Sequence, residues 1–420
     1  MTYNKKIDFL YNHFTSILDL EFDFKNKLNF VISQYFRNNK QLGSKDRKLL
    51  NILLYNYYRY SIYFNSMNDT SKFEIFLINF LMCKNVLILS DTFDYIINEF
   101  DIFVRENTDL LINCFKVFDH ITENIEEVNK LSFTTIYKSE IDNLSSELYS
   151  ILNTKAPVSL RSIYLENDTK SIENELKTLG IEFEKNELGL LDLNTLKNFD
   201  ISLKSKNIDY EIQDNGSFLI SRFVASLKAN TILDACAGSG GKALAISYFD
   251  KTKSIDIYDK DSKRLSEFSN RSKGKHKNIR SLKKLDNNKF YDIVLIDAPC
   301  SGAGTIRRSP DKKYTITEAI IDEFSGLQTK VIHDYSKYVK DEGLLVYVTC
   351  SLFTKENIEV VNNFLNENRN FRPVEINDNF IDNYSLKISN FAKILIPIKY
   401  NGDIFFIAVL QKISEKKDKE

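Results

Sequence analysis

The chain has 420 residues, 43% of them hydrophobic, and a formal net charge of −1. A chain of this length is expected to hold two or three domains and can bury a sizeable core. A net charge near zero excludes a protein that attracts nucleic acid through its overall charge, so any basic contact surface has to be local.

Cysteine usage and the N-terminus indicate where the protein works. Five cysteines are present without a Cys-x-x-Cys spacing, which favours free thiols in a reducing compartment and argues against a zinc site. Residues Met1–Lys6 lead into no apolar signal core, and no uncharged apolar run approaches the length of a membrane span. We therefore expect a soluble, cytoplasmic protein that holds no metal and binds no membrane.

Residues 1–135 are predicted to form an all-helical domain. They contain one glycine, Gly43, and no proline. Apolar residues recur at helical spacing, as in the run Leu50–Tyr58, and similar patches lie at 87–91 and 110–112. Two of the cysteines, Cys83 and Cys114, lie among apolar residues here and are expected to be packing groups.

Residues 136–212 are predicted to hold a connector and a small α/β unit. A helical connector over 136–150 precedes a strand over 156–164. A helix follows over 168–179 and is stopped by Gly180. A short strand over 181–184 completes the unit.

Strands alternate with helices over residues 213–412, which favours a doubly wound parallel α/β sheet, and a charged tail follows over 413–420. The expected strands are Thr231–Asp234, Ser254–Asp259, Ile279–Leu282, Tyr291–Asp297, Gly343–Thr349 and Ile404–Leu410.

A glycine-rich turn follows the first of these strands. Its residues are Cys236, Ala237, Gly238, Ser239, Gly240, Gly241 and Lys242. Such a turn brings backbone N–H groups and a helix N-terminus close to a ligand. The phosphate-loop pattern fails because Cys236 and Ala243 replace its first glycine and its hydroxyl residue, and the dinucleotide pattern has Ala243 at its third glycine.

Two acids complete a ligand site of this type. Asp259 ends the second strand, 18 residues after Gly241, where a carboxylate suits a ribose diol. Asp297 ends the strand over 291–297. Together with the glycine turn they fit an adenosyl ligand. Without a phosphate-binding signature, S-adenosylmethionine is favoured over ATP or NAD.

Two buried strands each lead to a cysteine. The run Ile293–Ile296 leads to Asp297 and then Cys300, and the run Leu344–Val348 leads to Cys350. Burying an acid and a thiol at strand ends costs free energy, which favours a functional role over incidental packing.

Four blocks resemble the RsmB/Nop/Sun family of RNA cytosine-5 methyltransferases. They are Gln213-Asp214-x-Gly216-Ser217, Asp234 to Lys242, Asp297 to Asp311 with Arg307 and Arg308 inside it, and Thr349-Cys350-Ser351 with Glu356-Asn357. More weakly, residues 1–135, including Leu42–Arg47, are similar to the NusB-like domain of bacterial RsmB. Residues 150–212 resemble that family's small RNA-contacting segment.

The resemblance implies a class I Rossmann-like methyltransferase sheet and a division of labour. Cys350 would be the nucleophile that adds to cytosine, and Cys300 would assist product release. Asp297 would bind the base near ring nitrogen 3. The turn Cys236–Lys242, Asp259 and Asp297 would hold S-adenosylmethionine. For Lys242 itself, direct contact with the cofactor and a solvated position in the first turn of the helix are equally compatible with the sequence. An acid that approaches adenine in the family is absent after the third strand, and Asp286 is not assigned to that role.

Several residues are candidates for RNA contact. Arg307 and Arg308 follow the Cys300 loop. A pair of arginines so close to the expected chemistry favours contact with nucleic acid over a solvated surface. The basic stretch Asn270–Lys284 is as compatible with a solvated loop as with a phosphate track. Lys155 and Arg161 form a further candidate surface. A base that undergoes chemistry has to leave its stack, so a locally unpaired RNA is expected.

Three classes of function remain open from the sequence. The first is a cytosine-5 methyltransferase of RNA, with small-subunit ribosomal RNA ahead of tRNA because of the NusB-like bundle. The second is a methyltransferase of DNA or a small molecule, which the Cys350 thiol disfavours because an intrinsically nucleophilic acceptor needs no covalent activation. The third is a non-catalytic RNA-binding ribosome-assembly factor, which would tolerate loss of the thiols. The oligomeric state is left open.

Overall fold

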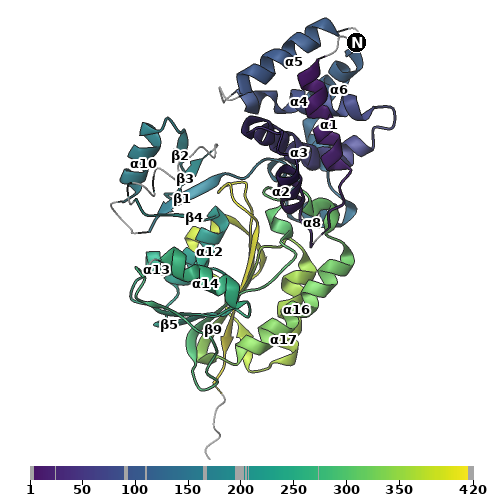
Figure 1. Cartoon of the computed structure of the whole chain (residues 1–420). Coiled ribbons are helices and arrows are strands. Elements are labelled where there is room, and N and C mark those ends of the chain that lie inside the picture. Colours follow the sequence, from purple (N-terminus) through teal and green to yellow (C-terminus); the bar gives the residue numbers. More distant parts are fainter. Residues whose placement is uncertain are drawn as a thin grey trace, which may run out of the picture. The chain divides into compact units, whose positions relative to one another are not determined.

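The computed structural model describes residues 4–414 except 24, 89–92, 109–110, 164–167, 194–202, 204–205, 207 and 273. Parts of three expected elements, at 89–91, 110 and 164, and most of the charged tail lie outside the described residues. The chain divides into two compact units (Figure 1). Unit 1 comprises Met1–Asp142, Leu152–Thr154 and Ser309–Ile316, and unit 2 comprises Asn143–Ile151, Lys155–Arg308 and Thr317–Glu420.

Unit 1 is helical over its described residues. Its helices are α1 (Lys5–Leu18), α2 (Leu28–Asn38), α3 (Ser44–Asn65), α4 (Lys72–Ile88), α5 (Asp94–Glu106), α6 (Ile112–Glu123), α7 (Ile125–Leu131), most of α8 (Thr135–Leu144) and α15 (Lys312–Thr315). The helical N-terminal region expected from the sequence is therefore confirmed. Its border at residue 135 and its likeness to NusB stay proposals.

Local sequence explains how these helices form. The Asn4 side chain caps α1 by accepting hydrogen bonds from the N–H groups of Lys6 and Ile7. Apolar residues of α1 and α3 then line one face and are buried in a single core with those of α4 and α5. Cys83 and Cys114 are buried in this core, where burial raises the pKa of Cys83 to about 12 and that of Cys114 to about 11.

Unit 1 also contains a segment from far along the sequence. Residues 309–316 follow the Cys300 loop, yet they pack with the helices of unit 1. The fully buried Lys313 ammonium donates to the backbone oxygens of Arg59 and Ser132 and to Asn153 Oδ1. This segment was not assigned to the helical domain from the sequence, because its partners lie at least 160 residues away.

Unit 2 holds two sheets. The smaller has the order β2-β3-β1-β4 and is antiparallel where β1 meets β3 and β4. Its strands are β1 (Val158–Ser162), β2 (Phe183–Lys185), β3 (Leu191–Leu193) and β4 (Tyr210–Ile212), with α10 (Asp168–Thr178) packed on them. The strand, helix and short strand expected in this region are present, and β3 and β4 are additional.

The larger sheet has the order β11-β12-β13-β9-β8-β5-β6-β7, and β10 pairs with β13. Its strands are β5 (Thr231–Asp234), β6 (Ser254–Ile257), β7 (Ile279–Ser281), β8 (Tyr291–Asp297), β9 (Val339–Thr349), β10 (Phe371–Pro373), β11 (Ser385–Ser389), β12 (Ala392–Leu395) and β13 (Phe405–Lys412). Strands β5 to β9 are parallel to their neighbours within that group, whereas β10 to β13 pair antiparallel. The expected α/β class is confirmed, and the all-parallel sheet is corrected to a mixed one.

Helices cover both faces of the larger sheet (Figure 1). Unit 2 contains most of α9 (Leu148–Leu152), α12 (Asn215–Ser226), α13 (Gly241–Phe249), α14 (Ser262–Ser272), η2 (Ala303–Thr305), α16 (Glu318–Ser336), η3 (Thr354–Glu356), α17 (Ile358–Glu367) and α18 (Asn379–Asp382). Along β8, Ile293 and Leu295 join the core under α12–α14, while Val294 and Ile296 join the core under α16 and α17. This alternation explains why the strand is a continuous apolar run.

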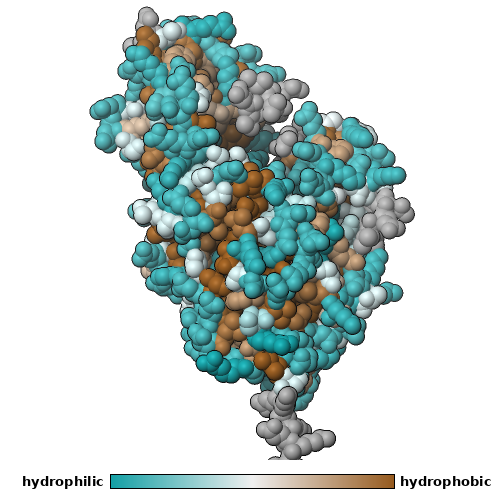
Figure 2. Space-filling model, turned by 180° about the vertical axis from the view of Figure 1, so that it is seen from behind, coloured by the Kyte–Doolittle hydropathy of each residue, from teal (hydrophilic) through white to brown (hydrophobic). Residues whose placement is uncertain are grey.

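The surface of unit 2 is mostly polar, with hydrophobic residues gathered on the face seen from behind (Figure 2). Among the described residues, no helix combines the length and apolar character that crossing a bilayer requires.

Candidate active site

The sulfur atoms of Cys300 and Cys350 lie 3.3 Å apart. Strands β8 and β9 are parallel neighbours, so their carboxyl ends, and the two cysteines after them, meet at one edge of the sheet. Both thiols are partly exposed. The pKa of Cys300 is raised well above its usual value by the hydrogen bond with Cys350, by burial, and by the charges of Cys350 and Glu356. These causes favour the protonated form of Cys300.

An ion pair lies beside the cysteines. Lys242 Nζ donates to Asp297 Oδ2 at 2.6 Å, and the lysine is 8% exposed. Burial works against the Lys242 charge, but Asp297, Cys350 and Asp234 together raise the pKa of Lys242. The structure therefore presents Lys242 as a buried cation fixed by Asp297, and not as the solvated first-turn lysine that the sequence left open.

Asp259, which comes after the neighbouring strand β6, holds the glycine turn in place. The N–H of Gly238 donates to Asp259 Oδ2 at 2.7 Å. Gly238 and Gly240 have φ values of 56° and 78°, and a Cβ on Gly240 would lie 2.5 Å from the Phe268 ring. Glycine is thus required at position 240 both by conformation and by space.

The other side chains of the turn have separate partners. Ser239 Oγ accepts from Arg271 Nη1 at 2.7 Å, and Cys236 packs in the core under α16 and α17. Burial raises the pKa of Cys236 far above its usual range. The raised pKa makes this thiol unsuited to act as a third nucleophile.

Asp234 is a candidate residue to which the sequence analysis gave no role. It ends β5 and is 0% exposed, and neither carboxylate oxygen has a hydrogen-bond partner. Burial and the nearby Asp297 charge raise the pKa of Asp234 to about 7. An unpaired buried carboxylate is costly, and the raised pKa, which favours the neutral acid, is the consequence. Its position at a strand end, directly before a glycine turn, was the available signal.

These groups gather where ligands bind in open α/β sheets. The strand order places β6 on one side of β5 and β8 on the other. The crevice outside the carboxyl ends of such a reversal is the usual ligand site. The four neighbouring strands are β6, β5, β8 and β9. Asp234 and Asp297 end β5 and β8, while Asp259 and Cys350 come just after β6 and β9.

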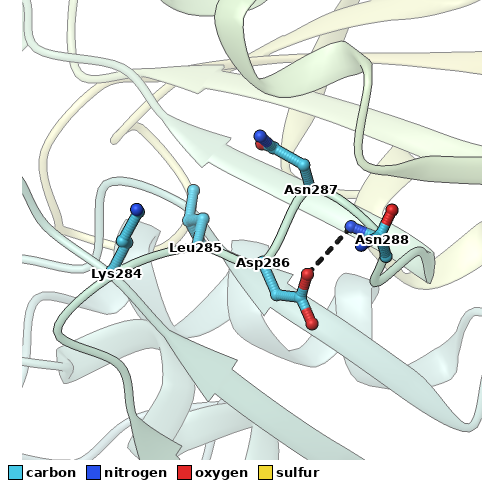
Figure 3. A pocket seen from close by; sticks show the side chains of 5 residues that line it. All are labelled: Lys284, Leu285, Asp286, Asn287 and Asn288. Atoms are coloured by element: carbon cyan, nitrogen blue, oxygen red, sulfur yellow. Dashed lines mark hydrogen bonds between the residues drawn. The ribbon is translucent and has the colours of Figure 1, made fainter.

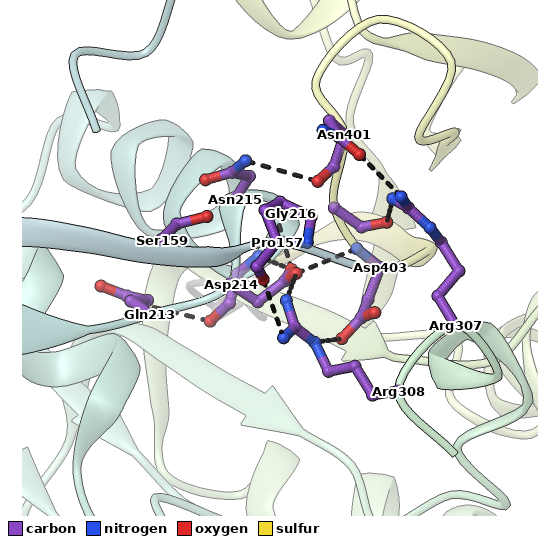
Figure 4. A network of polar contacts seen from close by, with 12 residues as sticks. Pro157, Ser159, Gln213, Asp214, Asn215, Gly216, Arg307, Arg308, Asn401 and Asp403 are labelled. Atoms are coloured by element: carbon purple, nitrogen blue, oxygen red, sulfur yellow. Dashed lines mark hydrogen bonds and ion pairs between the residues drawn. The ribbon is translucent and has the colours of Figure 1, made fainter. Parts of the chain in front are cut away.

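Arg307 and Arg308 are held in a polar network within unit 2 (Figure 4). Arg307 is 2% exposed and donates to Asn401 Oδ1 at 2.7 Å and to the Gly402 backbone oxygen at 3.1 Å. Arg308 donates to Asp214 Oδ2 at 2.9 Å and to Asp403 Oδ2 at 3.0 Å. Backbone and amide oxygens enclose the Arg307 guanidinium, which disfavours the expected nucleic-acid contact, and that contact stays a prediction. Arg308 forms ion pairs with the carboxylates of Asp214 and Asp403.

This network joins motifs that are far apart in the sequence. Asp214 caps α12 by accepting from the N–H groups of Gly216 and Ser217, and it also accepts from the Asp403 N–H. A Cβ on Gly216 would lie 2.6 Å from the Asp403 backbone oxygen. The block at 213–217 therefore supports the loop that precedes β13.

Four of the basic side chains expected to form an RNA surface have acidic or buried partners. Arg271 pairs with Glu211, Lys275 with Asp209, and Arg280 with Asp256. Arg161 is 2% exposed and donates to Gln213. These contacts favour a structural role over a continuous phosphate track.

One open pocket lies apart from the cysteines. Its volume is about 410 Å³, and it is lined by the loop after β7: Lys284, Leu285, Asp286, Asn287 and Asn288 (Figure 3). Asp286 Oδ1 accepts from the Asn288 N–H at 3.0 Å. No cysteine and no residue of the glycine turn lines it, so the pocket is not included in the candidate active site.

Residues 223–411 match the family model described as 16S rRNA methyltransferase RsmB/F. Over this region, a little under half of the chain, the protein is similar to the RsmB/F methyltransferases. The expected resemblance is thereby confirmed for the larger sheet and its helices.

Two similar proteins carry names that match the description of the family model. The chain is 29% identical to the probable ribosomal RNA small subunit methyltransferase B of Bacillus subtilis over 265 residues, which cover 60% of this chain and 59% of the relative. It is 30% identical to ribosomal RNA small subunit methyltransferase B of Proteus mirabilis over 209 residues, 48% of this chain and 46% of the relative. The matches thus span about half of each relative.

Solved structures share the fold. The crystal structure of PH0851 aligns with a TM-score of 0.67 and 19% identity over 98% of this chain and 100% of that one. NSun6 from Pyrococcus horikoshii, solved with SFG, aligns with a TM-score of 0.52 and 18% identity over 69% of this chain and 98% of that one. At these identities the likeness is one of fold.

Proposed function

We propose that this protein methylates carbon 5 of a cytosine in RNA, with S-adenosylmethionine as the methyl donor and small-subunit ribosomal RNA as the substrate. The observation that carries the proposal is the pair of thiols, Cys300 and Cys350, 3.3 Å apart beside the Lys242–Asp297 ion pair. The family match and the names of the relatives support the methyl-transfer reaction and the RNA.

The chemistry of the glycine turn and the acids around it supports S-adenosylmethionine as the cofactor. S-adenosylmethionine carries a sulfonium and an ammonium group, and both carboxylate oxygens of the buried Asp234 have no hydrogen-bond partner. Asp259 follows the neighbouring strand, where it suits the ribose diol. SFG, an analogue of S-adenosylmethionine, is present in the NSun6 structure that shares this fold. In the proposal, residues 236–242 with Asp259 and Asp297 hold the cofactor, which supplies an electrophilic methyl group when bound.

Cys350 acts as the nucleophile in this proposal. Its thiolate bonds to carbon 6 of cytosine, and the electron pair moves to carbon 5, which can then take the methyl group. Lys242 is a buried cation whose pKa Cys350 helps to raise, so the same attraction favours the Cys350 thiolate. Asp297 accepts a hydrogen bond from the base near ring nitrogen 3.

Release requires the reverse electron movement. Water takes the proton from carbon 5, the electron pair of that C–H bond forms the ring double bond, and the pair of the bond between sulfur and carbon 6 returns to Cys350 as a thiolate. Cys300 assists this step, and its raised pKa keeps it as a thiol beside the Cys350 sulfur. Free thiols at the site need reducing conditions, which supports a cytoplasmic location.

The test is bisulfite sequencing of total RNA from cells with and without the gene. The proposal expects one 5-methylcytosine of small-subunit ribosomal RNA to disappear with the gene. Loss of a mark in tRNA would keep the reaction and replace the substrate. An unchanged RNA methylation pattern would contradict the proposed activity.

A further inference from the structure

Glu356 is a buried acid that the proposed mechanism does not use. It ends η3, six residues after Cys350, and is 0% exposed. Its Oε1 accepts from the Ser301 N–H at 2.8 Å and from Gln328 Nε2 at 3.1 Å. Its Oε2 accepts from the hydroxyl groups of Ser301 and Ser351. An ionised carboxylate has about four acceptor positions, so these donors satisfy it.

The donors come from both cysteine loops. Ser301 directly follows Cys300, and Ser351 directly follows Cys350. Gln328, on α16, also donates to the backbone oxygen of Pro299, the residue before Cys300. One carboxylate therefore connects the chain on either side of Cys300 to the chain after Cys350.

Glu356 is itself held in place. The Tyr347 hydroxyl donates to its backbone oxygen at 2.8 Å, and Asn357 Nδ2 donates to the Ser351 backbone oxygen at 2.9 Å. Tyr347 and Asn357 are buried. Charge-assisted hydrogen bonds to a fixed acceptor restrict the donors more than neutral ones do.

We propose that Glu356 is a positioning residue that sets the distance between the two thiols by joining the Cys300 loop to the Cys350 loop. The proposal rests on the proposed function for its kinetic consequence, whereas the sulfur–sulfur distance can be tested without RNA or cofactor. Glu356 touches neither sulfur in the described contacts, so it acts through Ser301 and Ser351.

The first experiment measures disulfide formation between the thiols in the full chain. Diamide accepts one hydrogen atom from each thiol as the sulfur–sulfur bond forms, and mass spectrometry of peptides identifies the Cys300–Cys350 pair. A disulfide needs the sulfurs at about 2.05 Å, so the rate reports how closely they are held. Glu356→Gln replaces two acceptor positions with a donor amide, and we expect a rate roughly 10-fold lower. Glu359→Gln, an exposed acid in the next helix, is expected to leave the rate unchanged.

The second experiment measures methyl transfer by the same variants. A displaced catalytic group lowers the rate of chemistry, so Glu356→Gln is expected to lower kcat about 10- to 100-fold with KM for RNA nearly unchanged. A merely structural role would not separate kcat from KM in this way. If Glu356→Gln fails to fold, Ser301→Ala and Ser351→Ala each remove one donor, and each is expected to slow disulfide formation.

The outcomes test the positioning role of Glu356 and the proposed methyltransferase function separately. A wild-type disulfide rate in Glu356→Gln, or in both serine variants where the Gln variant is unfolded, would overturn the positioning role. A slowed rate supports it. No methyl transfer by the wild-type protein, together with a slowed disulfide rate in the variant, would contradict the proposed function and leave the positioning role standing.

Discussion

Cys300 and Cys350 are 50 residues apart in the sequence, yet their sulfur atoms lie 3.3 Å apart at the carboxyl ends of β8 and β9. The contact arises because β8 and β9 pair in parallel, with Asp297 opposite Val348. Cys300 comes three residues after Asp297, and Cys350 comes two residues after Val348, so the two thiols leave the sheet at nearly the same level. The geometry supports a division of roles in which one sulfur keeps its proton and the other is the nucleophile.

Cys300→Ala tests the release role. If Cys300 assists elimination, the variant should form the Cys350–cytosine bond but break it slowly, so protein and RNA should stay joined on a denaturing gel. Cys83→Ala, in the core of unit 1, is the control and should give no such product. A Cys300→Ala protein that turns over without retained RNA would remove the release role.

Asp259→Asn tests the cofactor site. Asp259 shapes the turn through Gly238, and in the proposal it also accepts from the ribose diol. Removing its charge should weaken S-adenosylmethionine binding about 10- to 100-fold, the range for a hydrogen bond to a charged group. Calorimetry of binding checks this, with the exposed Asp261→Asn as control. Equal affinities in both variants and the wild type would exclude the ribose assignment.

Asp234→Asn tests the unpaired carboxylate through the pH dependence of stability. Because the folded-state pKa of Asp234, about 7, lies above its usual 3.8, the folded protein holds this proton more tightly than the unfolded chain. The resulting destabilisation is absent below about pH 3.8, grows through this range and is complete above about pH 7. A rise in pKa from 3.8 to about 7 corresponds to about 4 kcal/mol at pH 8. The variant should therefore melt several degrees higher than the wild type at pH 8 and nearly equally at pH 4.

The same variant should bind S-adenosylmethionine more weakly, since a neutral amide attracts a cation less than a carboxylate does. Asp403 also has a pKa raised to about 7, by burial and by Asp214, so the wild-type profile contains both acids. The difference between variant and wild type isolates Asp234. A pH-independent difference would contradict the assigned cause.

How far the sequence could predict this site depends on how local each signal is. Strands β5 and β8 have the bounds expected from their apolar runs, and the glycine turn follows β5 as expected. Both depend on neighbouring residues. The roles of Arg307 and Glu356 depend on partners 94 and 55 residues away, Asn401 and Ser301. An arginine after a catalytic motif has the same local pattern whether it binds RNA or backbone oxygens, so only the fold distinguishes them.

The mixed sheet illustrates the same limit at a larger scale. The short strands β11 and β12 lie in a region with no long apolar run, and they are stabilised by pairing with each other and with β13. Side-chain periodicity is weak over so few residues, whereas cross-strand pairing supplies the stabilisation.

Lys313→Met tests the segment that belongs to unit 1. The substitution keeps much of the side-chain volume but removes the donor shared by the backbone oxygens of Arg59 and Ser132 and by Asn153. Taking a donor away from buried acceptors costs about 1–3 kcal/mol, which we expect as a lower denaturant midpoint. The half-buried neighbour Lys312→Met serves as control. A midpoint equal to the wild type would show that the buried ammonium does not stabilise unit 1.

The most direct measurement is the amount of 5-methylcytosine formed when purified small-subunit ribosomal RNA is incubated with S-adenosylmethionine and either the wild-type protein or Cys350→Ala. Nucleosides released from the RNA are quantified by mass spectrometry. The account predicts one new 5-methylcytosine per RNA with the wild type and none with Cys350→Ala, while Cys83→Ala behaves as wild type. Equal product from wild type and Cys350→Ala would contradict the covalent mechanism.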